Sequence, residues 1–367
     1  MSQVPFLVPS LDLKPALAET EPIWRSHLEQ VLQRGRFVLG EELAAFEGEF
    51  ATLMGAGFAV GVGSGTDALE LCLRACGLTS REQEVLTSPL TAPFTGLAVL
   101  AAGARLRFAD VDPETLLLDP ASVAARITPG TAALLPVHLY GQPCVLRSFQ
   151  RFGLPLIQDA CQAHGARYQG RPLTDYSPFV AYSFYPTKNL GCLGDGGAVA
   201  TSEEAVAQRI RLLRDGGRSA DHCSQVVGIN SRLDELQCCF LRAFLPRLAE
   251  WNRRRRLLAD CYDELLRECS GVQLLARSEE SVCHLYVVRA KERERLREYL
   301  GQQGVASAVH YPVPLHQQPA FADCGARPGD LPQAERACQE ILSLPLWPQL
   351  ELQTVERIAQ AVRRFYR

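Results

Sequence analysis

The sequence lacks an excess of charge of either sign. Its 38 lysine and arginine residues stand against 41 aspartate and glutamate residues, so the formal net charge is -3 and the isoelectric point is about 6.2. Domains that bind nucleic acid usually carry a strongly basic surface. We therefore expect no nucleic-acid partner.

Cysteine is plentiful, but the spacings that bind metal ions are absent. The 13 cysteines include no CxxC pair and no combination with histidine at ligand spacing. An odd number of cysteines without a secretory signal is typical of small buried side chains in a reducing compartment. We therefore expect no metal site.

Recognisable targeting and membrane segments are also missing. The stretch from Met1 to Lys14 has no basic region followed by an apolar one, as a signal peptide would have. Val85 to Ala104 carries no charge over 20 residues, but Pro89 and Pro93 interrupt it, which indicates a strand, a turn and a buried helix. We expect a cytoplasmic protein that has no contact with a membrane.

Short apolar segments alternate with helical ones through the first two-thirds of the chain, without internal repeats. This pattern predicts an α/β fold with a mainly parallel central sheet that helices cover on both faces. Because the chain has 367 residues, we expect two domains: a large α/β domain over residues 1–245, including an N-terminal arm, and a small α+β domain over residues 246–367. The strands predicted for the large domain are 58–62, 105–109, 132–137, 154–157, 179–184 and 197–201.

The chain beyond residue 245 is more charged. The run from Arg253 to Arg256 is predicted to open a helix, whose solvated face is a simpler explanation of these charges than contact with a substrate diphosphate. Further elements predicted here are strands at 284–290 and 305–311 and helices at 292–303 and 351–366.

Lys188 stands in the run Ser183-Phe184-Tyr185-Pro186-Thr187-Lys188-Asn189-Leu190-Gly191, with Gly194-Asp195-Gly196-Gly197 behind it. Low polarity lowers the pKa of a lysine and favours the neutral amine that attacks an aldehyde. Glycines allow a bulky group to approach the backbone closely. By itself, such a lysine is more often a surface charge than a nucleophile.

Two further runs contain candidate binding groups. The turn Gly61-Val62-Gly63-Ser64-Gly65-Thr66-Asp67 follows a predicted strand and opens a helix, which suits a phosphate site, although by itself a tight turn in which Thr66 or Asp67 caps the helix is the simpler explanation. The run Gln158-Asp159-Ala160-Cys161-Gln162-Ala163-His164-Gly165 places Asp159 just past a buried strand. A carboxylate there can pair with a protonated pyridine nitrogen, or it can cap a helix; His164 is better explained as a structural residue.

A fourth run, Asn230-Ser231-Arg232-Leu233-Asp234-Glu235-Leu236-Gln237, is predicted to start a helix after a mobile loop from Gly216 to Val227. The simpler explanation of its polar residues is that Asn230 or Ser231 caps this helix while the charges that follow form a solvated face.

Phosphate turn, aspartate and lysine occur in the order used by fold type I enzymes that carry pyridoxal 5'-phosphate (PLP). At this point the chain resembles the DegT/DnrJ/StrS family of sugar-nucleotide aminotransferases over nearly its whole length. Besides the runs above, the matching segments are Phe37-Val38-Leu39-Gly40, Ser64-Gly65-Thr66-Asp67-Ala68-Leu69, Val137-His138-Leu139-Tyr140-Gly141-Gln142 and Val309-His310-Tyr311-Pro312.

The resemblance implies a role for each matching residue. Lys188 would bind PLP as a Schiff base and later move a proton between the substrate and the cofactor, and Asp159 would bind the pyridinium nitrogen. Gln162 would lie near the phenolic oxygen of the cofactor, and Gly65, Thr66 and Ser183 would bind its phosphate. Asn230 would complete the phosphate site of a partner subunit, which implies a homodimer with shared active sites. His310 and Tyr311 would approach the sugar substrate.

Two residues depart from the family pattern. Ala92 stands where the family usually has an aromatic residue that stacks on the PLP ring, so either Phe94 stacks instead or the ring is held differently. Cys161 replaces an expected alanine, which we interpret as a packing change.

The retained Lys188 also indicates the reaction, because dehydratases of this family have histidine there. The resemblance implies an aminotransferase that cycles between PLP and its aminated form, PMP, by a ping-pong mechanism. The amino donor would be L-glutamate and the acceptor a nucleotide-linked keto-sugar, with a preference for a 3-keto-6-deoxy sugar. The alternatives are a PLP-dependent sugar dehydratase or epimerase, and a non-catalytic regulator that binds PLP or a sugar nucleotide.

Overall fold

The computed structural model describes residues 8–219, 221 and 223–367. Two predicted segments lie partly outside the described residues. They are the N-terminal arm, at residues 1–7, and the loop from Gly216 to Val227, at residues 220 and 222. None of the helices in the described part of the chain is both long enough and apolar enough to cross a membrane.

The central sheet forms from two groups of strands that meet edge to edge. One group has the order β1-β9-β8-β5 and the other β3-β2-β4, and parallel bridges from Leu134 to Leu156 and from Val137 to Asp159 join them. Only β9 runs against its neighbours β1 and β8, so the prediction of a mainly parallel sheet is confirmed. The strands are β1 (Phe58–Val62), β2 (Glu84–Thr87), β3 (Arg105–Phe108), β4 (Thr131–Leu135), β5 (Gln158–Asp159), β8 (Val180–Ser183) and β9 (Gly197–Thr201).

Helices cover this sheet because each of them has an apolar face to bury. Leu69, Leu71 and Leu73 of α3 are buried, and α3 packs on β8 and β9, while α2 and α7 pack on β1. The helices around the sheet are α2 (Glu41–Met54), α3 (Gly65–Ala75), α4 (Pro93–Ala102), α5 (Pro120–Arg126), α6 (Leu146–Gln150) and α7 (Glu204–Arg214). A short hairpin, β6 (Arg167–Tyr168) and β7 (Arg171–Pro172), lies outside the sheet.

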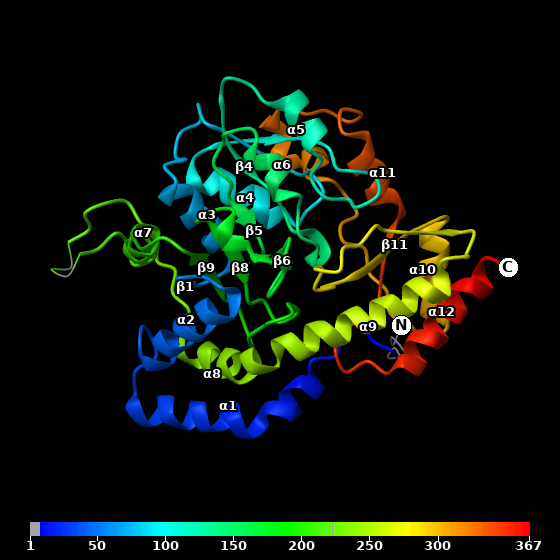
Figure 1. Ribbon diagram of the computed structural model, residues 1–367, viewed down its shortest axis with the longest axis horizontal. Coiled ribbons are helices and arrows are strands. Elements are labelled where there is room, and N and C mark those ends of the chain that lie inside the picture. The colour runs from blue at the N-terminus through cyan, green and yellow to red at the C-terminus, as the bar shows by residue number, and fades with distance from the viewer. Residues whose placement is uncertain (1–7, 220, 222) are drawn as a thin grey trace.

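A line of helices leads from the central sheet to a second, smaller sheet. Helix α8 (Glu235–Phe244) packs against α1 (Lys14–Arg34) and continues through a 3-10 turn at Leu245–Arg247 into α9 (Leu248–Leu266), which passes beneath both sheets in Figure 1. The predicted domain boundary falls at this 3-10 turn. Two helix starts were predicted wrongly, because α9 begins at Leu248 rather than at Arg253, and α8 begins at Glu235 rather than at Asn230.

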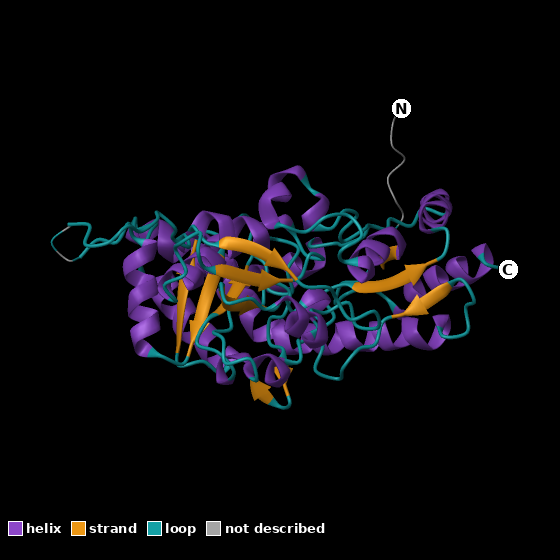
Figure 2. Ribbon diagram, turned by 90° about the horizontal axis from the view of Figure 1, so that it is seen from above, coloured by secondary structure: helices purple, strands orange, loops and turns teal. Residues whose placement is uncertain are grey.

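The second sheet is antiparallel, with β11 (Tyr286–Ala290) between β10 (Val272–Leu274) and β12 (Ile341–Leu344), and Figure 2 shows it well separated from the first. The two helices predicted here form as α10 (Arg293–Gln302), which packs on β11 and β12, and α12 (Leu352–Phe365), which packs on α9 and α10. The predicted strand at 305–311 is wrong, because only isolated bridges form at Val305 and Ala308. The main-chain oxygen of His310 instead accepts a hydrogen bond from the central domain.

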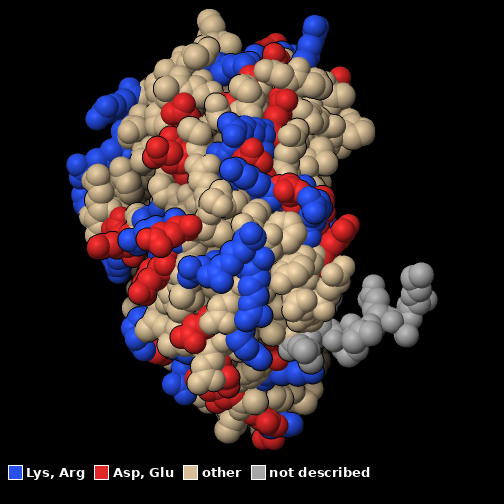
Figure 3. Space-filling model, turned by 90° about the vertical axis from the view of Figure 1, so that its right-hand side faces the viewer, with Lys and Arg blue, Asp and Glu red and all other residues tan. Residues whose placement is uncertain are grey.

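Two apolar cores follow this division in part. The second core joins α9, β11, β12 and α12, whereas residues 315–341, including α11 (Pro332–Glu340), contribute to the core of the central sheet. The division at residue 245 therefore stays a prediction. Figure 3 shows acidic and basic side chains intermixed over the end of the molecule that carries the second sheet, where ion pairs such as Arg297–Glu294 form along helices.

Candidate active site

Lys188 lies in the turn that follows β8, next to Asp159 at the end of β5. Its main-chain N–H donates to the carbonyl of Tyr185, 2.9 Å away, and the side chain is partly buried. Burial lowers the pKa of Lys188 because it removes water from the ammonium group, while Cys161 and Asp159 act in the opposite direction. At a given pH, a larger fraction of Lys188 is therefore in the neutral, nucleophilic form than of an ordinary lysine.

The carboxylate of Asp159 is buried, with 5% of the residue exposed, and has no ion-pair partner among the described residues. Its Oδ2 accepts a hydrogen bond from Thr95 at 2.7 Å, and its Oδ1 accepts one from the N–H of Cys161 at 3.1 Å. No helix begins after Asp159, so the helix-cap alternative is wrong. A buried carboxylate with only neutral donors fits a cationic N–H group of a ligand.

The glycine turn packs directly against the end of β8. A Cβ atom on Gly65 would lie 2.6 Å from Cβ of Ser183 and 2.9 Å from Sγ of Cys161, so only glycine fits. Ser64 caps α3 by accepting from the N–H of Asp67 at 3.1 Å, so the proposed caps Thr66 and Asp67 are wrong. Because the first N–H groups of a helix have no partner within it, those of Gly65 and Thr66 are left for an anion beside Ser183.

The segment that begins at Asn230 lies beside this turn. Oγ of Ser231 accepts from the N–H of Gly63 at 2.8 Å and donates to Oδ2 of Asp67 at 2.6 Å. Asn230 itself is exposed and forms a backbone bridge with Asp215. Its predicted role in a partner subunit therefore stays a prediction.

The solvated face expected for the charges that follow Asn230 forms only in part, because Asp234 is exposed whereas Glu235 is not. Glu235 is buried, and its carboxylate accepts from the N–H groups of Gly40, Glu42 and Leu43 at 2.8, 2.9 and 3.0 Å. These are donors at the start of α2 that the helix cannot satisfy itself. Glu235 is thus the N-terminal cap of a helix almost 200 residues earlier, which local sequence patterns cannot reveal.

The predicted cofactor and substrate residues meet at Gln162. Its Nε2 donates to the hydroxyl of Tyr311 at 3.2 Å, and its Oε1 accepts from the N–H of Tyr140 at 2.6 Å. The adjacent His310 forms a hydrogen bond between its Nδ1 and Oγ of Ser343 at 2.8 Å. Gln162, His310 and Tyr311 therefore lie in one connected network, although 148 positions separate Gln162 from His310 in the sequence.

Three histidines near Lys188 are held neutral. Burial lowers the pKa of His164 to about 3, and it also lowers the pKa values of His284 and His310, in each case assisted by the positive charge of Lys188. His164 bonds the carbonyl of Ser183 through Nε2 at 2.8 Å, in agreement with a structural role. At neutral pH these imidazoles add no positive charge that would compete with Lys188 for an anion.

A buried amide network fixes the residue next to Lys188. Nδ2 of Asn189 donates to Oδ1 of Asn252 on α9 at 2.8 Å and to the carbonyl of Val282 at 3.0 Å. Both amide hydrogens are thereby used, so Oδ1 of Asn189 accepts and Nδ1 of His284 must donate across 3.0 Å. The lysine turn is thus anchored to the chain beyond residue 245.

Several of these residues were missed from the sequence. Thr95 follows Thr91 by four positions, their hydroxyls lie 2.9 Å apart, and this pair of threonines at the predicted start of a helix was the available signal. Asn189 adjoins Lys188, but nothing local indicates that His284 would reach it. Tyr140 lies in the matching segment Val137–Gln142, but its type and position there predict no role.

The two departures from the family pattern lie at the site. Phe94 is 58% exposed at the start of α4, which leaves it free to turn, and its stacking stays a prediction. Burial raises the pKa of the Cys161 thiol well above its usual value, so the thiol stays protonated. This agrees with the interpretation of Cys161 as a packing change.

The run Arg253–Arg256 is only partly a solvated face. Arg253 pairs with Glu250 at 2.6 Å in solvent, whereas Arg255 is buried and donates to the carbonyls of His284 and Leu346, both at 3.1 Å. Arg255 therefore ties α9 to the segment that carries His284.

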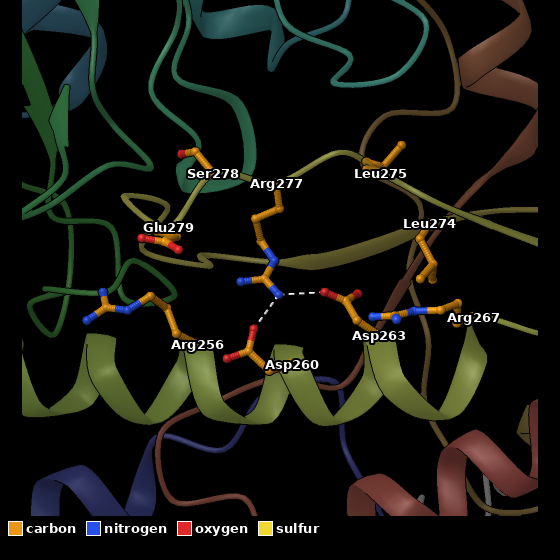
Figure 4. Close-up of a pocket in the computed structure, with 9 residues that line it drawn as sticks. All are labelled: Arg256, Asp260, Asp263, Arg267, Leu274, Leu275, Arg277, Ser278 and Glu279. Atoms are coloured by element: carbon orange, nitrogen blue, oxygen red, sulfur yellow. Dashed lines mark hydrogen bonds and ion pairs between the residues drawn. The ribbon is translucent and has the colours of Figure 1, made fainter. Parts of the chain in front are cut away.

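Two cavities lie outside this site, and Arg256, from the run considered for contact with a substrate diphosphate, lines the first of them. One of about 400 Å³ lies between α9 and the segment 274–279 (Figure 4), and another of about 620 Å³ lies beside β10 and α10. In the first, Arg277 donates to Asp260 at 2.6 Å and to Asp263 at 2.5 Å, so these three charged side chains pair with one another. Over residues 8–219, 221 and 223–367, no group of three or more His, Cys, Asp or Glu side chains is arranged to hold a metal ion.

Comparison with known proteins gives matches along nearly the whole chain. Residues 21–363 match the DegT/DnrJ/EryC1/StrS aminotransferase family. The chain is 43% identical over 364 residues to the dTDP-3-amino-3,4,6-trideoxy-alpha-D-glucose transaminase of Streptomyces venezuelae, covering 98% of this chain and 96% of the relative. It is 38% identical over 368 residues to the pleiotropic regulatory protein of Geobacillus stearothermophilus, covering 98% and 99%. The crystal structure of S. venezuelae DesV in complex with a ketimine intermediate matches with a TM-score of 0.95 and 42% identity over 99% of each chain.

Proposed function

The chain belongs to the DegT/DnrJ/EryC1/StrS aminotransferase family, and from this premise we propose that it transfers an amino group from an amino acid to a nucleotide-linked keto-sugar, with PLP as its cofactor. The observation that carries the proposal is the juxtaposition of Lys188, whose pKa is lowered, with the buried and unpaired carboxylate of Asp159. PLP needs these two groups, an amine for its aldehyde and an anion for its pyridinium nitrogen.

The remaining residues fit the other parts of the cofactor. Gly65, Thr66 and Ser183 would hold its phosphate at the start of α3, and Gln162 would lie near its phenolic oxygen. Bound PLP supplies an electron sink for the carbon that loses or gains a proton. Asp159 would keep that sink effective by holding the ring nitrogen protonated, and Thr95 holds the Asp159 carboxylate in place at 2.7 Å.

Lys188 would act as the proton carrier. Because burial favours its neutral form, the amine can take a proton from the substrate carbon and return it within the same site. We propose L-glutamate as the amino donor and a ping-pong order, in which the donor leaves as a 2-oxo acid before the keto-sugar enters. His310 and Tyr311 would contact the sugar.

The substrate is proposed to be a 3-keto-6-deoxy sugar linked to a nucleotide. The support is the name of the S. venezuelae relative, a transaminase of a 3-amino-3,4,6-trideoxy sugar, at 43% identity. Purified protein should aminate a 3-keto sugar nucleotide faster than the matched 4-keto compound, with product analysis by mass spectrometry. Preference for the 4-keto compound would overturn this choice of carbon.

The direct test of the reaction is an absorption spectrum. The protein should bind PLP with a visible band that L-glutamate converts to the shorter-wavelength band of the aminated cofactor. The chain has three lysines, Lys14, Lys188 and Lys291. Borohydride should therefore fix PLP covalently to Lys188 in the wild type. A Lys188→Ala variant should not be labelled, whereas a Lys291→Ala control should be labelled as the wild type is. A band that no amino acid changes would reject amino transfer.

A regulatory function is the second candidate, because the G. stearothermophilus relative is named a pleiotropic regulatory protein. A regulator needs to bind its ligand but has no use for a lysine of lowered pKa beside an unpaired carboxylate. PLP binding without turnover by L-glutamate and any keto-sugar nucleotide would favour regulation.

A homodimer with shared active sites is proposed from the apolar surface around the site. Phe94, Leu97 and Leu100 form an exposed stripe on α4, 58%, 38% and 42% exposed, and Tyr185 of the lysine turn is 52% exposed. Such surfaces mark interfaces between subunits. Asn230 would then complete the phosphate site of the partner.

Mixing variants tests this assembly. Lys188→Ala and Asn230→Ala are each expected to be inactive, and if Asn230 serves the partner subunit, mixed dimers should recover up to about a quarter of the wild-type activity by random pairing. Light scattering should also show monomers for Leu97→Glu. Absence of recovery in mixed dimers would refute the shared site. We further propose a cytoplasmic location, which the 13 unpaired cysteines support.

A further inference from the structure

Tyr140 has a backbone conformation that its side chain disfavours. It lies in the 3-10 turn Leu139–Gly141 with φ 57° and ψ 13°, and it is buried. A bulky residue in this left-handed region is uncommon and strained, and it persists only where its surroundings hold it. Such residues gather at functional sites, so the contacts of Tyr140 indicate what its conformation serves.

Those contacts use every polar group of the residue. Its N–H donates to Oε1 of Gln162 at 2.6 Å, its carbonyl accepts from the N–H of His284 at 2.8 Å, and its hydroxyl donates to the main-chain oxygen of His310. The next residue, Gly141, has φ 89°, and a Cβ there would lie 2.9 Å from the main-chain nitrogen of His284 and 3.0 Å from the main-chain oxygen of Gln162. Tyr140 thus touches three segments that are far apart in the sequence.

Each of these segments carries a group of the site. Because the N–H of Tyr140 occupies Oε1 of Gln162, the amide must present Nε2 to the hydroxyl of Tyr311, as observed at 3.2 Å. His284 continues to Asn189, the neighbour of Lys188. His310 is the residue that would approach the sugar.

We propose that Tyr140 is a positioning residue that holds the His310–Tyr311 segment and the Gln162 amide in one arrangement, so that the keto-sugar meets Lys188 correctly. The inference rests on the proposed function for the nature of the substrate, but not for the arrangement itself. Burial raises the pKa of Tyr140 well above its usual value, so the hydroxyl remains a donor over the working pH range.

The test removes one oxygen atom. Tyr140→Phe keeps both main-chain contacts and loses only the hydroxyl contact with His310. Tyr262→Phe is the matched control. Tyr262 is a buried tyrosine of the second core, and its hydroxyl donates to the carbonyl oxygen of Pro345 at 3.1 Å, so this variant loses the same kind of hydrogen bond away from the site. The holoenzyme of each variant is measured for KM, kcat, PLP band and amide hydrogen exchange.

Tyr140→Phe should raise the KM for the keto-sugar nucleotide by about two- to tenfold, the range expected when one hydrogen bond is lost, with a smaller change in kcat. Exchange should accelerate in the peptide covering residues 306–313, while the PLP band and the KM for the amino donor stay within about twofold. Tyr262→Phe should change none of these. The effects of Tyr140→Phe and Tyr311→Phe on KM should not multiply, because both act on one network.

A KM shift and an exchange rate in Tyr140→Phe no larger than those of Tyr262→Phe would overturn the proposal. Loss of PLP binding in Tyr140→Phe would also overturn it, because Tyr140 would then support the whole fold rather than the sugar side. If the wild type aminates no keto-sugar nucleotide, the proposed function fails, and the exchange measurement still decides whether Tyr140 holds the His310–Tyr311 segment. If Tyr140→Phe does not fold, Tyr311→Phe tests the same network, and an unchanged KM in that variant would count against it.

Discussion

Replacing Gly65 by alanine tests the close packing on which the phosphate site depends. The added Cβ would lie 2.6 Å from Cβ of Ser183 and 2.9 Å from Sγ of Cys161. The thiol can turn aside, but Cβ of Ser183 is fixed to β8, so the start of α3 must move. Overpacking of this kind costs about 1–3 kcal/mol, whereas alanine in a helix gains only about 0.5–1 kcal/mol over glycine.

The net expectation for Gly65→Ala is a loss of about 1–2 kcal/mol in unfolding free energy. Displacing the N–H groups of Gly65 and Thr66 should also weaken PLP binding by about tenfold, equivalent to about 1.4 kcal/mol. Urea unfolding followed by circular dichroism measures the first effect in the cofactor-free protein. Titration with PLP, followed by tyrosine and tryptophan fluorescence, measures the second.

Gly48→Ala is the control for the intrinsic effect of the substitution. Gly48 lies within α2, and a Cβ there meets nothing within 4 Å. This variant should gain about 0.5–1 kcal/mol and bind PLP normally. A Gly65→Ala protein as stable as Gly48→Ala, with unchanged PLP affinity, would refute the packing argument.

Four further predictions concern other contacts of the site and its support. Glu235→Ala should lower the unfolding free energy by about 1–3 kcal/mol in urea denaturation because it leaves three N–H groups of α2 without a partner, while Glu235→Gln keeps one acceptor oxygen and should lose less. Thr95→Val should weaken PLP binding by about tenfold or more in equilibrium titration, because Asp159 loses a donor, and Thr95→Ser should restore it. The rate of PLP uptake by the cofactor-free protein should rise with pH and level off below pH 10.5, since the pKa of Lys188 is lowered from 10.5 and only the neutral amine reacts. Between that lowered pKa and pH 10.5, Lys188 is protonated in the unfolded chain but largely neutral in the folded one. In this pH window the group therefore makes the free energy of unfolding increase with pH, and a Lys188→Met protein should lose that increase.

Much of the fold could be predicted because its signals are local. Strands such as 58–62 and 197–201 are short apolar runs between turns, and α12 shows one apolar face over its length. The strand predicted at 305–311 has the same local character, yet it does not form, because contacts with Tyr140 and Gln162 hold His310 and Tyr311. Competition between a local preference and distant partners cannot be weighed from a window of sequence.

The site divides in the same way. Lys188, Asp159 and the glycine turn could be identified from their residue types and order, because each needs particular chemistry at the end of a strand. Asn189 and His284 could not, since their importance lies in partners 63 to 95 positions away. Glu235 was expected on a solvated face of its own helix, whereas it is buried and caps α2.

The sequence by itself therefore determined the α/β class, the order of the chemical groups and the resemblance that identifies the family. These depend on residue types and their spacing along the chain, which need no coordinates. Only the tertiary structure decided the environment of Lys188 and Asp159, the fit of Gly65 on Ser183, and the left-handed turn at Tyr140 that joins three distant segments. Burial, contact and the direction of a hydrogen bond are properties of atoms that meet in space, and the meeting of these segments is fixed by the packed fold.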